Sequence, residues 1–168
     1  MACDFITTGR AEPCKDSVGG VRAVYFSDDF GVVTYDVTDT DVITAVAGTP
    51  NAYKYEVKGA STYTETVTSS RENGTTYFEE VLELQLPKLT KEDHKAIKLL
   101  SYGHPRVIIE DNNGNAFVAG LEYGLDVTGG TIATGAAMGD TSGYTLTFTG
   151  MEKIPANFLA EAVAGNTA

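Results

Sequence analysis

The chain has 168 residues, of which 42% are hydrophobic and 21% charged, as expected for one globular domain with a real core. Its 12 Lys and Arg against 23 Asp and Glu give a net charge of −11. This balance argues against a protein that grips nucleic acid, because such grip needs clustered cations. Eighteen Gly, many Thr and no Trp favour a mainly β protein rich in turns.

The first 20 residues mix glycine, proline, cysteine and charged residues, so we expect an N-terminal arm (1–20) ahead of a single domain (21–168). No basic segment followed by an apolar run begins the chain, and no stretch of about 18 apolar residues occurs. We therefore expect neither a signal peptide nor a membrane span. Cys3 and Cys14 fit no zinc spacing and are interpreted as free thiols, with a loop-closing disulfide as the alternative.

Strand patterns begin at Arg22 and recur through the first half of the chain. We interpret 22–27 and 32–37 as a hairpin, followed by strands at 42–47 and 53–57 and an edge strand at 61–69. The longest strand is predicted at 75–86, where Glu80 interrupts an otherwise apolar face. We expect Glu80 at a strand end or rim, or paired with a lysine.

A helix is predicted over about 90–101. Thr90 is a suitable N-cap, and the two acids that follow Lys91 lie where the positive end of the helix dipole favours them. The spacing of the apolar residues predicts that one stripe is buried against the sheet and that the lysines point outward. That stripe consists of Ala96, Ile97, Leu99 and Leu100.

A hairpin is the clearest local signal, between Pro105 and Glu122. A β-branched run and a second apolar run flank Asn113-Gly114, a pair that readily takes the positive φ angles of a tight turn. The exposed tip of this hairpin is our candidate for a functional surface. It comprises Glu110, Asp111, Asn112 and Asn113.

The last third of the sequence predicts a strand at 121–128, a turn at Gly129-Gly130 and a small-residue loop at 135–143. A core strand follows at 144–149, expected to pair with one strand of the hairpin, and Pro155 suits the start of a short C-terminal helix. The expected fold class is mainly β: an antiparallel β-sandwich or barrel with one flanking α-helix (about 90–101) and a short C-terminal helix.

No catalytic or cofactor-binding constellation emerges from the sequence. His94 lies within the predicted helix, and His104 follows its C-terminus, where capping explains it better than catalysis. The acidic segment 36–41 resembles a calcium loop in composition but lacks the required glycine and glutamate, so a solvated turn is the preferred interpretation. We expect no enzyme activity, no cofactor and no metal.

From Tyr102 to Leu159, with its run GGTIATGAAMGDTSGYTLTFTGME followed by IPANFL, the chain resembles structural proteins of tailed bacteriophages, most closely tail-tube or tail-tube-like ring subunits. The resemblance implies a β-sandwich or barrel with a helix beside it, hexameric rings stacked into a tube, and a lumen that conducts DNA. The net charge then acquires a role, since acidic residues facing a lumen repel phosphates along its wall.

The resemblance also implies the partners: further copies of the chain and other virion proteins, with DNA as a passing cargo, no membrane, and assembly in the host cytoplasm into a virion. The hairpin tip would face the lumen or the next ring, and the arm, with loop 51–74 or 129–143, would join rings. The alternatives are a head-to-tail joining ring, a capsid-decorating protein, the inner tube of a contractile injection system or, from another class, a carbohydrate-binding module.

Overall fold

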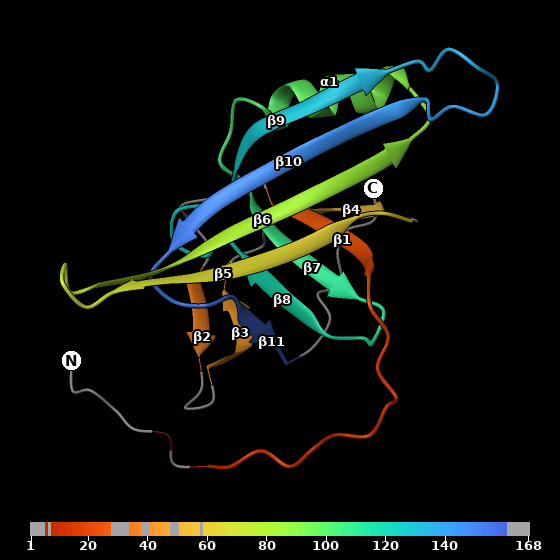
Figure 1. The fold of residues 1–168 in the computed structure, drawn as a ribbon. Helices are drawn as coiled ribbons and strands as arrows, with labels where there is room; N and C mark the ends of the chain where they lie inside the picture. The colour runs from red at the N-terminus through yellow and green to blue at the C-terminus, as the bar shows by residue number, and fades with distance from the viewer. Residues whose placement is uncertain are drawn as a thin grey trace.

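The computed structural model describes residues 6, 8–27, 34–37, 41–47, 51–57 and 59–160, with the backbone alone for 34–37 and 45–47. These residues form two β-sheets packed face to face and one helix beside them (Figure 1). The mainly β, sandwich-like fold with one helix expected from the sequence is therefore confirmed. No helix in the described ranges is long and apolar enough to cross a membrane.

The four-stranded sheet is antiparallel throughout, in the order β5-β6-β10-β9. Its strands are long because alternating apolar and polar residues continue for most of each run. Their bounds are β5 (Thr62–Ser70), β6 (Thr75–Pro87), β9 (Asp126–Ala133) and β10 (Gly143–Glu152).

The seven-stranded sheet has the order β2-β3-β11-β8-β7-β1-β4 and is antiparallel except where β11 runs parallel to β3. It contains both the first and the last strand of the described chain. Its strands are β1 (Val21–Ser27), β2 (Thr34–Val37), β3 (Val42–Ala47), β4 (Ala52–Glu56), β7 (Arg106–Asp111), β8 (Ala116–Ala119) and β11 (Asn157–Leu159).

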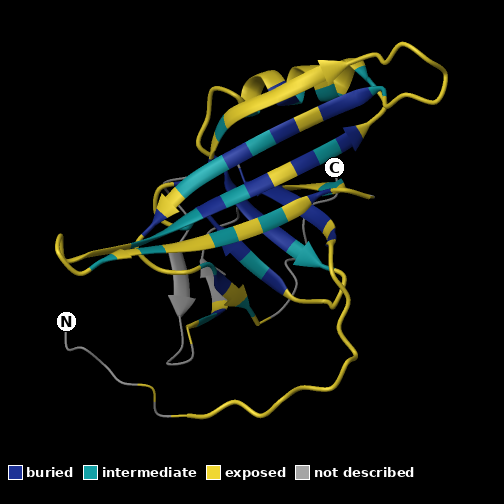
Figure 2. Cartoon of the chain, in the orientation of Figure 1, coloured by how far each residue is buried: buried dark blue, intermediate teal, exposed yellow. Residues whose placement is uncertain are grey.

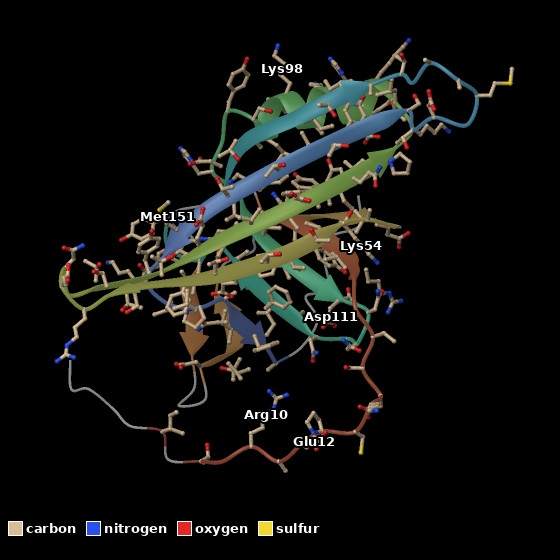
Figure 3. All side chains as sticks on the ribbon, viewed as in Figure 1. Arg10, Glu12, Lys54, Lys98, Asp111 and Met151 are labelled. Carbon is tan, nitrogen blue, oxygen red and sulfur yellow. The ribbon has the colours of Figure 1, made fainter. Side chains whose placement is uncertain are left out.

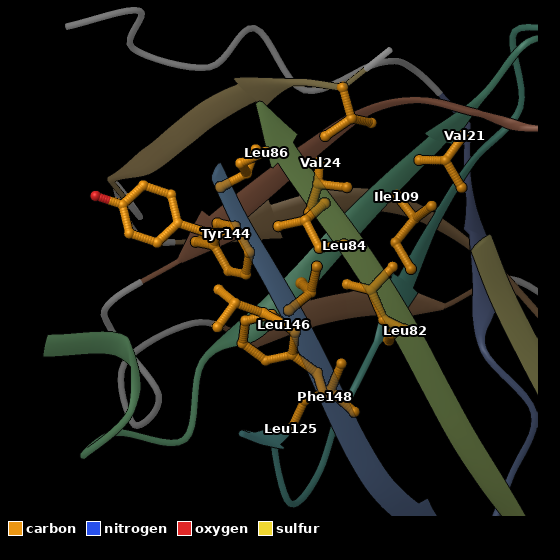
Figure 4. Packing of buried hydrophobic residues seen from close by; sticks show 14 of the residues in the cluster. Val21, Val24, Leu82, Leu84, Leu86, Ile109, Leu125, Tyr144, Leu146 and Phe148 are labelled. Atoms are coloured by element: carbon orange, nitrogen blue, oxygen red, sulfur yellow. The ribbon is translucent and has the colours of Figure 1, made fainter. Parts of the chain in front are cut away.

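The main core lies between the two sheets (Figures 2 and 4). Leu82 and Leu84 of β6 and Phe148 of β10 meet Val24 and Ile109 from the opposite sheet, and all five are at most 1% exposed. A smaller cluster, which includes Tyr25, Ile108 and Val118, lies on the other face of the seven-stranded sheet. The prediction that the strand at 144–149 points Tyr144, Leu146 and Phe148 inward is confirmed.

Helix α1 (Lys91–Leu100) begins as the sequence predicts, with the Thr90 side chain accepting a hydrogen bond of 3.1 Å from the Asp93 amide. Ile97 is buried, but Leu99 is 63% exposed, so its expected burial is wrong. The reason is geometric: α1 leans against the rim of the sandwich rather than across a sheet face, and one turn of the apolar stripe is left uncovered (Figure 1).

The hairpin between Pro105 and Glu122 is confirmed as β7 and β8, with Ile109 opposite Phe117. Its turn differs in detail from the expectation, because Gly114 has a φ of 85° while Asn113 keeps a negative φ. The Gly114 amide donates to the Asp111 carbonyl at 3.3 Å, so the turn spans Asp111 to Gly114 and a single left-handed glycine completes it.

Two pairings and one helix expected from the sequence are wrong. β1 does not form a hairpin with β2; it lies between β4 and β7, because both of its faces are apolar and need a central position. β10 pairs with β6 and β9 rather than with a strand of the β7–β8 hairpin. Residues 157–159 form β11 instead of a helix, because they complete the seven-stranded sheet beside β8; residues 161–168 lie outside the described range.

The segment after the hairpin also differs from its prediction. The strand expected at 121–128 begins only at Asp126, after a turn in which Gly120 and Gly124 both have positive φ. Gly129 and Gly130 lie inside β9 rather than in a turn. A Cβ on Gly130 would lie 2.4 Å from the Thr145 carbonyl oxygen, so this glycine permits close approach of the two strands. The loop predicted at 135–143 is confirmed: it comprises residues 134–142, and β10 begins at Gly143.

Candidate functional site

The four-stranded sheet carries acidic residues and no basic ones. None of its four strands contains Lys, Arg or His, although all four are fully described. By contrast, the other sheet and the helix carry cations such as Arg22, Lys54 and Lys98. The acids of the four-stranded sheet are Glu65, Glu79, Glu80, Glu83, Asp126 and Glu152.

The outer face of this sheet is a polar surface of threonines and acids. Directly opposite residues of antiparallel strands share a face, and the register places Thr62, Glu83 and Thr147 in one row. The next rows add Glu79 and Asp126. We call this surface the threonine–acid face; it is formed by Thr62, Thr64, Thr66, Glu79, Val81, Glu83, Gln85, Asp126, Thr131, Thr145, Thr147 and Thr149.

Both edges of the sheet are open. β5 pairs only with β6, and β9 pairs only with β10, so each edge strand presents a row of backbone amides and carbonyls without a strand partner in the described chain. β9 is exposed along most of its length (Figure 2). Neither strand contains a Lys or Pro that would block pairing with another chain. Such edges are a template for a further strand.

The inner face of the same sheet holds three glutamates that bind chain segments linking the two sheets. Glu80 is 1% exposed, and its Oε2 accepts a hydrogen bond of 2.7 Å from the Gly120 amide. Glu152 Oε1 accepts from the Tyr123 amide at 2.9 Å, and Glu65 Oε1 accepts from the Ala156 amide at 3.2 Å. The expectation that Glu80 lies at a rim or pairs with a lysine is therefore wrong; a backbone amide satisfies it.

This buried group has perturbed titration. Burial raises the pKa of Glu80 to about 7, since the hydrogen bond from Gly120 only partly offsets it and the neighbouring Glu152 and Glu65 add to it. Burial also raises the pKa of Glu152 and of Glu65. The hydroxyl of Tyr63 lies beside them, and burial followed by the charge of Glu80 raises its pKa. These carboxyls link the four-stranded sheet to segments that lead to the other sheet. In the sequence, the only sign of this cluster is Glu80, which interrupts the apolar face of its strand.

The hairpin tip predicted as a functional surface is placed at the end of β7, and its four residues do lie together. Glu110 is half-buried, with Oε1 3.8 Å from Arg22 Nη1. Asp111 organises the turn, accepting from the amides of Asn113 and Asn115 at 2.9 and 2.8 Å. Burial pushes the pKa of Asp111 up, but the hydrogen bonds from Asn115 and Asn113 outweigh it and leave the pKa below its ordinary value.

Asn112 and Asn113 bind the last residues of the N-terminal arm, next to the domain. The Val18 amide donates to Asn113 Oδ1 at 2.9 Å, and Asn113 Nδ2 donates back to the Val18 carbonyl at 2.7 Å. Asn112 Nδ2 donates to the Gly19 carbonyl at 2.8 Å. The tip therefore fixes where the arm leaves the domain, a role that becomes visible only when residues more than 90 positions apart meet. Whether it faces a lumen or a neighbouring ring stays a prediction.

The histidines and cysteines do not converge on a site. His104 pairs through Nδ1 with Asp126, while the exposed His94 ring lies 6.3 Å from the ring of Tyr144. Cys14 is a free, exposed thiol, and Cys3 and residues 38–40 of the acidic segment lie outside the described residues. Within the described ranges, no group of three His, Cys, Asp or Glu side chains is arranged to hold a metal ion.

Comparison with protein-family models, with curated proteins and with solved structures finds no match to this chain.

Proposed function

We propose that this protein is a structural component of a tailed-bacteriophage virion: a tail-tube subunit whose copies form stacked rings around an acidic lumen that conducts DNA. The observation that carries the proposal is the four-stranded sheet, which combines an exposed face lacking any basic residue with two unpaired edges. A monomer gains nothing from two such edges, whereas a ring buries both.

Ring closure follows from pairing β5 of one copy with β9 of the next. This contact is head-to-tail, and a constant rotation between copies closes it into a ring in which the four-stranded sheets form one continuous barrel. The hexameric number comes from the resemblance to tail tubes. The main-chain hydrogen bonds of β5 and β9 would provide the joint, and the flanking threonines suit an extended backbone.

The lumen wall in this arrangement is the threonine–acid face. Glu83 is exposed on it and Glu79 is half-buried, and no lysine or arginine of the same strands compensates them. Asp126 is exposed as well, and it pairs with His104. The wall therefore repels DNA phosphates instead of binding them, which keeps friction low during passage. Screening limits this repulsion to about 8 Å at physiological ionic strength, so it acts close to the wall.

The test compares two charge-reversal variants of equal net charge. Glu79→Lys with Glu83→Lys changes the lumen wall, and Glu72→Lys with Glu92→Lys changes exposed acids outside this sheet. We expect purified protein to form rings or tubes by electron microscopy and light scattering. We also expect tubes of the first variant to retain duplex DNA at low salt, and tubes of the second and of the unmodified chain to release it.

A monomeric protein that binds glycans would contradict the proposal in favour of a carbohydrate-binding module. Isolated rings that never stack would favour a joining ring. Equal DNA retention by the two variants would show that the threonine–acid face does not line the lumen.

A further inference from the structure

An apolar groove lies between α1 and β4, at the edge of the sandwich. Its volume is about 530 Å³, within the range of sites that take an apolar group. Aromatic side chains from β1 and β4 form one wall and the second half of α1 forms the other. The apolar residues that form these two walls are Phe26, Tyr53, Tyr55, Ala96, Leu99 and Leu100.

The groove has exposed apolar side chains at its rim. Leu99 is 63% exposed and Tyr53 is 43% exposed, although both belong to segments whose neighbours are packed into the core. β4 is also the last strand of its sheet and pairs with β1 alone in the described chain. The site therefore offers two things at once: an open strand edge and an apolar hollow beside it, the combination that an extended peptide uses.

Upstream of Val18 and Gly19, the described part of the N-terminal arm is an extended, irregular segment. Residues 8–20 are all exposed and form no regular secondary structure, and Ile6 is 95% exposed. Upstream of Val18, the described arm residues make no hydrogen bond to another described residue. Fifteen extended residues from 6 to 20 can span up to about 50 Å, which exceeds the radius of a domain of this size.

The arm leaves its own domain in the direction away from the groove. Asn112 and Asn113 bind Val18 and Gly19 and so fix the exit. Figure 3 shows Arg10 and Glu12 of the arm at one end of the molecule and Lys98 of α1 at the other, and Figure 1 shows the arm passing beneath the seven-stranded sheet. To enter its own groove the arm would have to reverse at this root and break those hydrogen bonds.

We propose that the groove between α1 and β4 binds the N-terminal arm of a second copy of this chain, with Ile6 as the apolar anchor and the arm backbone added to the open edge of β4. The inference deepens the proposed self-assembly and rests on it: edge pairing of β5 with β9 builds a ring, and arm exchange joins one ring to the next. It identifies Leu99 and Tyr53 as inter-subunit contacts rather than solvent-exposed residues.

Disulfide trapping between full-length chains tests this directly. In a background with Cys3→Ser and Cys14→Ser, a chain carrying Ile6→Cys is mixed with a tagged chain carrying Leu99→Cys, assembled and oxidised. The matched control replaces Leu99→Cys by Lys98→Cys, the adjacent exposed position on α1. We expect the Ile6–Leu99 product to exceed the control by about tenfold, because docking raises the local concentration of the two thiols.

The outcomes separate the two proposals. Assembled rings or tubes with equal trapping at positions 98 and 99 overturn arm exchange while leaving the proposed function standing. A monomeric species in light scattering overturns both. A chain carrying Ile6→Cys and Leu99→Cys together that closes an intramolecular disulfide shows that the arm binds its own groove, which also overturns the exchange.

A second variant gives a readout that needs no cysteine. Leu99→Asp introduces a charge into the groove at an exposed position, where folding tolerates it, and Lys98→Asp is the control on the same helix. We expect Leu99→Asp to form rings that stack poorly, raising the protein concentration needed for tubes about tenfold, and Lys98→Asp to stack like the unmodified chain. Normal stacking of Leu99→Asp contradicts the inference.

Discussion

The two sheets of this protein differ in strand length, in charge and in their edges. The strands of the four-stranded sheet have 8 to 13 residues, carry no cation and end in two open edges. The strands of the seven-stranded sheet have 3 to 7 residues and mix charges, as in the Lys54–Glu56 pair at 3.3 Å. Under the proposed function the four-stranded sheet is the surface that meets other copies, and the seven-stranded sheet holds the first and the last described strands, β1 and β11.

The largest effect is expected where the two sheets meet. Phe148 is 0% exposed, and its ring lies 5.4 Å from that of Phe26 across the core. Phe148→Ala should lower the free energy of unfolding by about 3–5 kcal/mol in urea denaturation, because a cavity replaces the ring. The control is Val67→Ala on edge strand β5 of the same sheet. The Val67 side chain is 60% exposed, so its truncation should lower the free energy of unfolding by less than about 0.5 kcal/mol. Similar losses at both positions would contradict the packed interface.

The second prediction concerns pH and the inner face of the four-stranded sheet. Because burial raises the pKa of Glu80 to about 7, the folded state binds this proton more tightly than the unfolded state does. The stabilisation is therefore complete below pH 4.5, the ordinary pKa of a glutamate, and is lost as the pH rises through 7. The free energy of unfolding should fall by roughly 2–3 kcal/mol between pH 5 and pH 8.

Replacing the carboxyl tests this assignment. Glu80→Gln keeps a carbonyl oxygen to accept from the Gly120 amide and removes the titration, so most of the pH dependence should disappear from denaturation curves. Glu83→Gln, on the threonine–acid face of the same strand, is the matched control and should keep the unmodified slope. A slope unchanged by Glu80→Gln would assign the pH dependence to other groups.

Two neighbouring glycines of β9 provide the third prediction. A Cβ at position 130 would lie 2.4 Å from the Thr145 carbonyl oxygen, whereas one at position 129 would meet nothing within 4 Å. Gly130→Ala should therefore destabilise the sheet by about 1–3 kcal/mol, and Gly129→Ala should have little effect on thermal unfolding. Equal effects would mean that β9 and β10 are not paired in this register.

The smallest effect is expected where the N-terminal arm binds the tip of the β7–β8 hairpin. Asn113→Ala removes the acceptor of the Val18 amide and the donor to the Val18 carbonyl. Hydrogen exchange of the Val18 amide should accelerate roughly fivefold, equivalent to about 1 kcal/mol, with the overall stability unchanged. Asn73→Ala, in the β5–β6 turn, is the control. Unchanged exchange at Val18 would show that the tip does not hold the arm.

Local signals predicted local structure well. The alternation from Thr75 predicted β6, Thr90 predicted the start of α1, and Asn113-Gly114 predicted the β7–β8 turn, because each depends on residues close in sequence. The pairings of β1 and β10 were wrong, since pairing depends on which apolar faces meet across the core. The seemingly misplaced Glu80 could have signalled the carboxyl cluster, but the amide that binds it belongs to Gly120, 40 positions further along the chain.

The sequence by itself determined the fold class, the acidic charge and the position of most strands, because period-two patterns and turn residues act within a few positions. Only the tertiary structure decided that the acids without cations share one sheet, that β5 and β9 end it with open edges, and that Asn113 receives an arm from 95 residues away. These are distances between segments far apart in the chain, and they are set by packing, which no local pattern encodes.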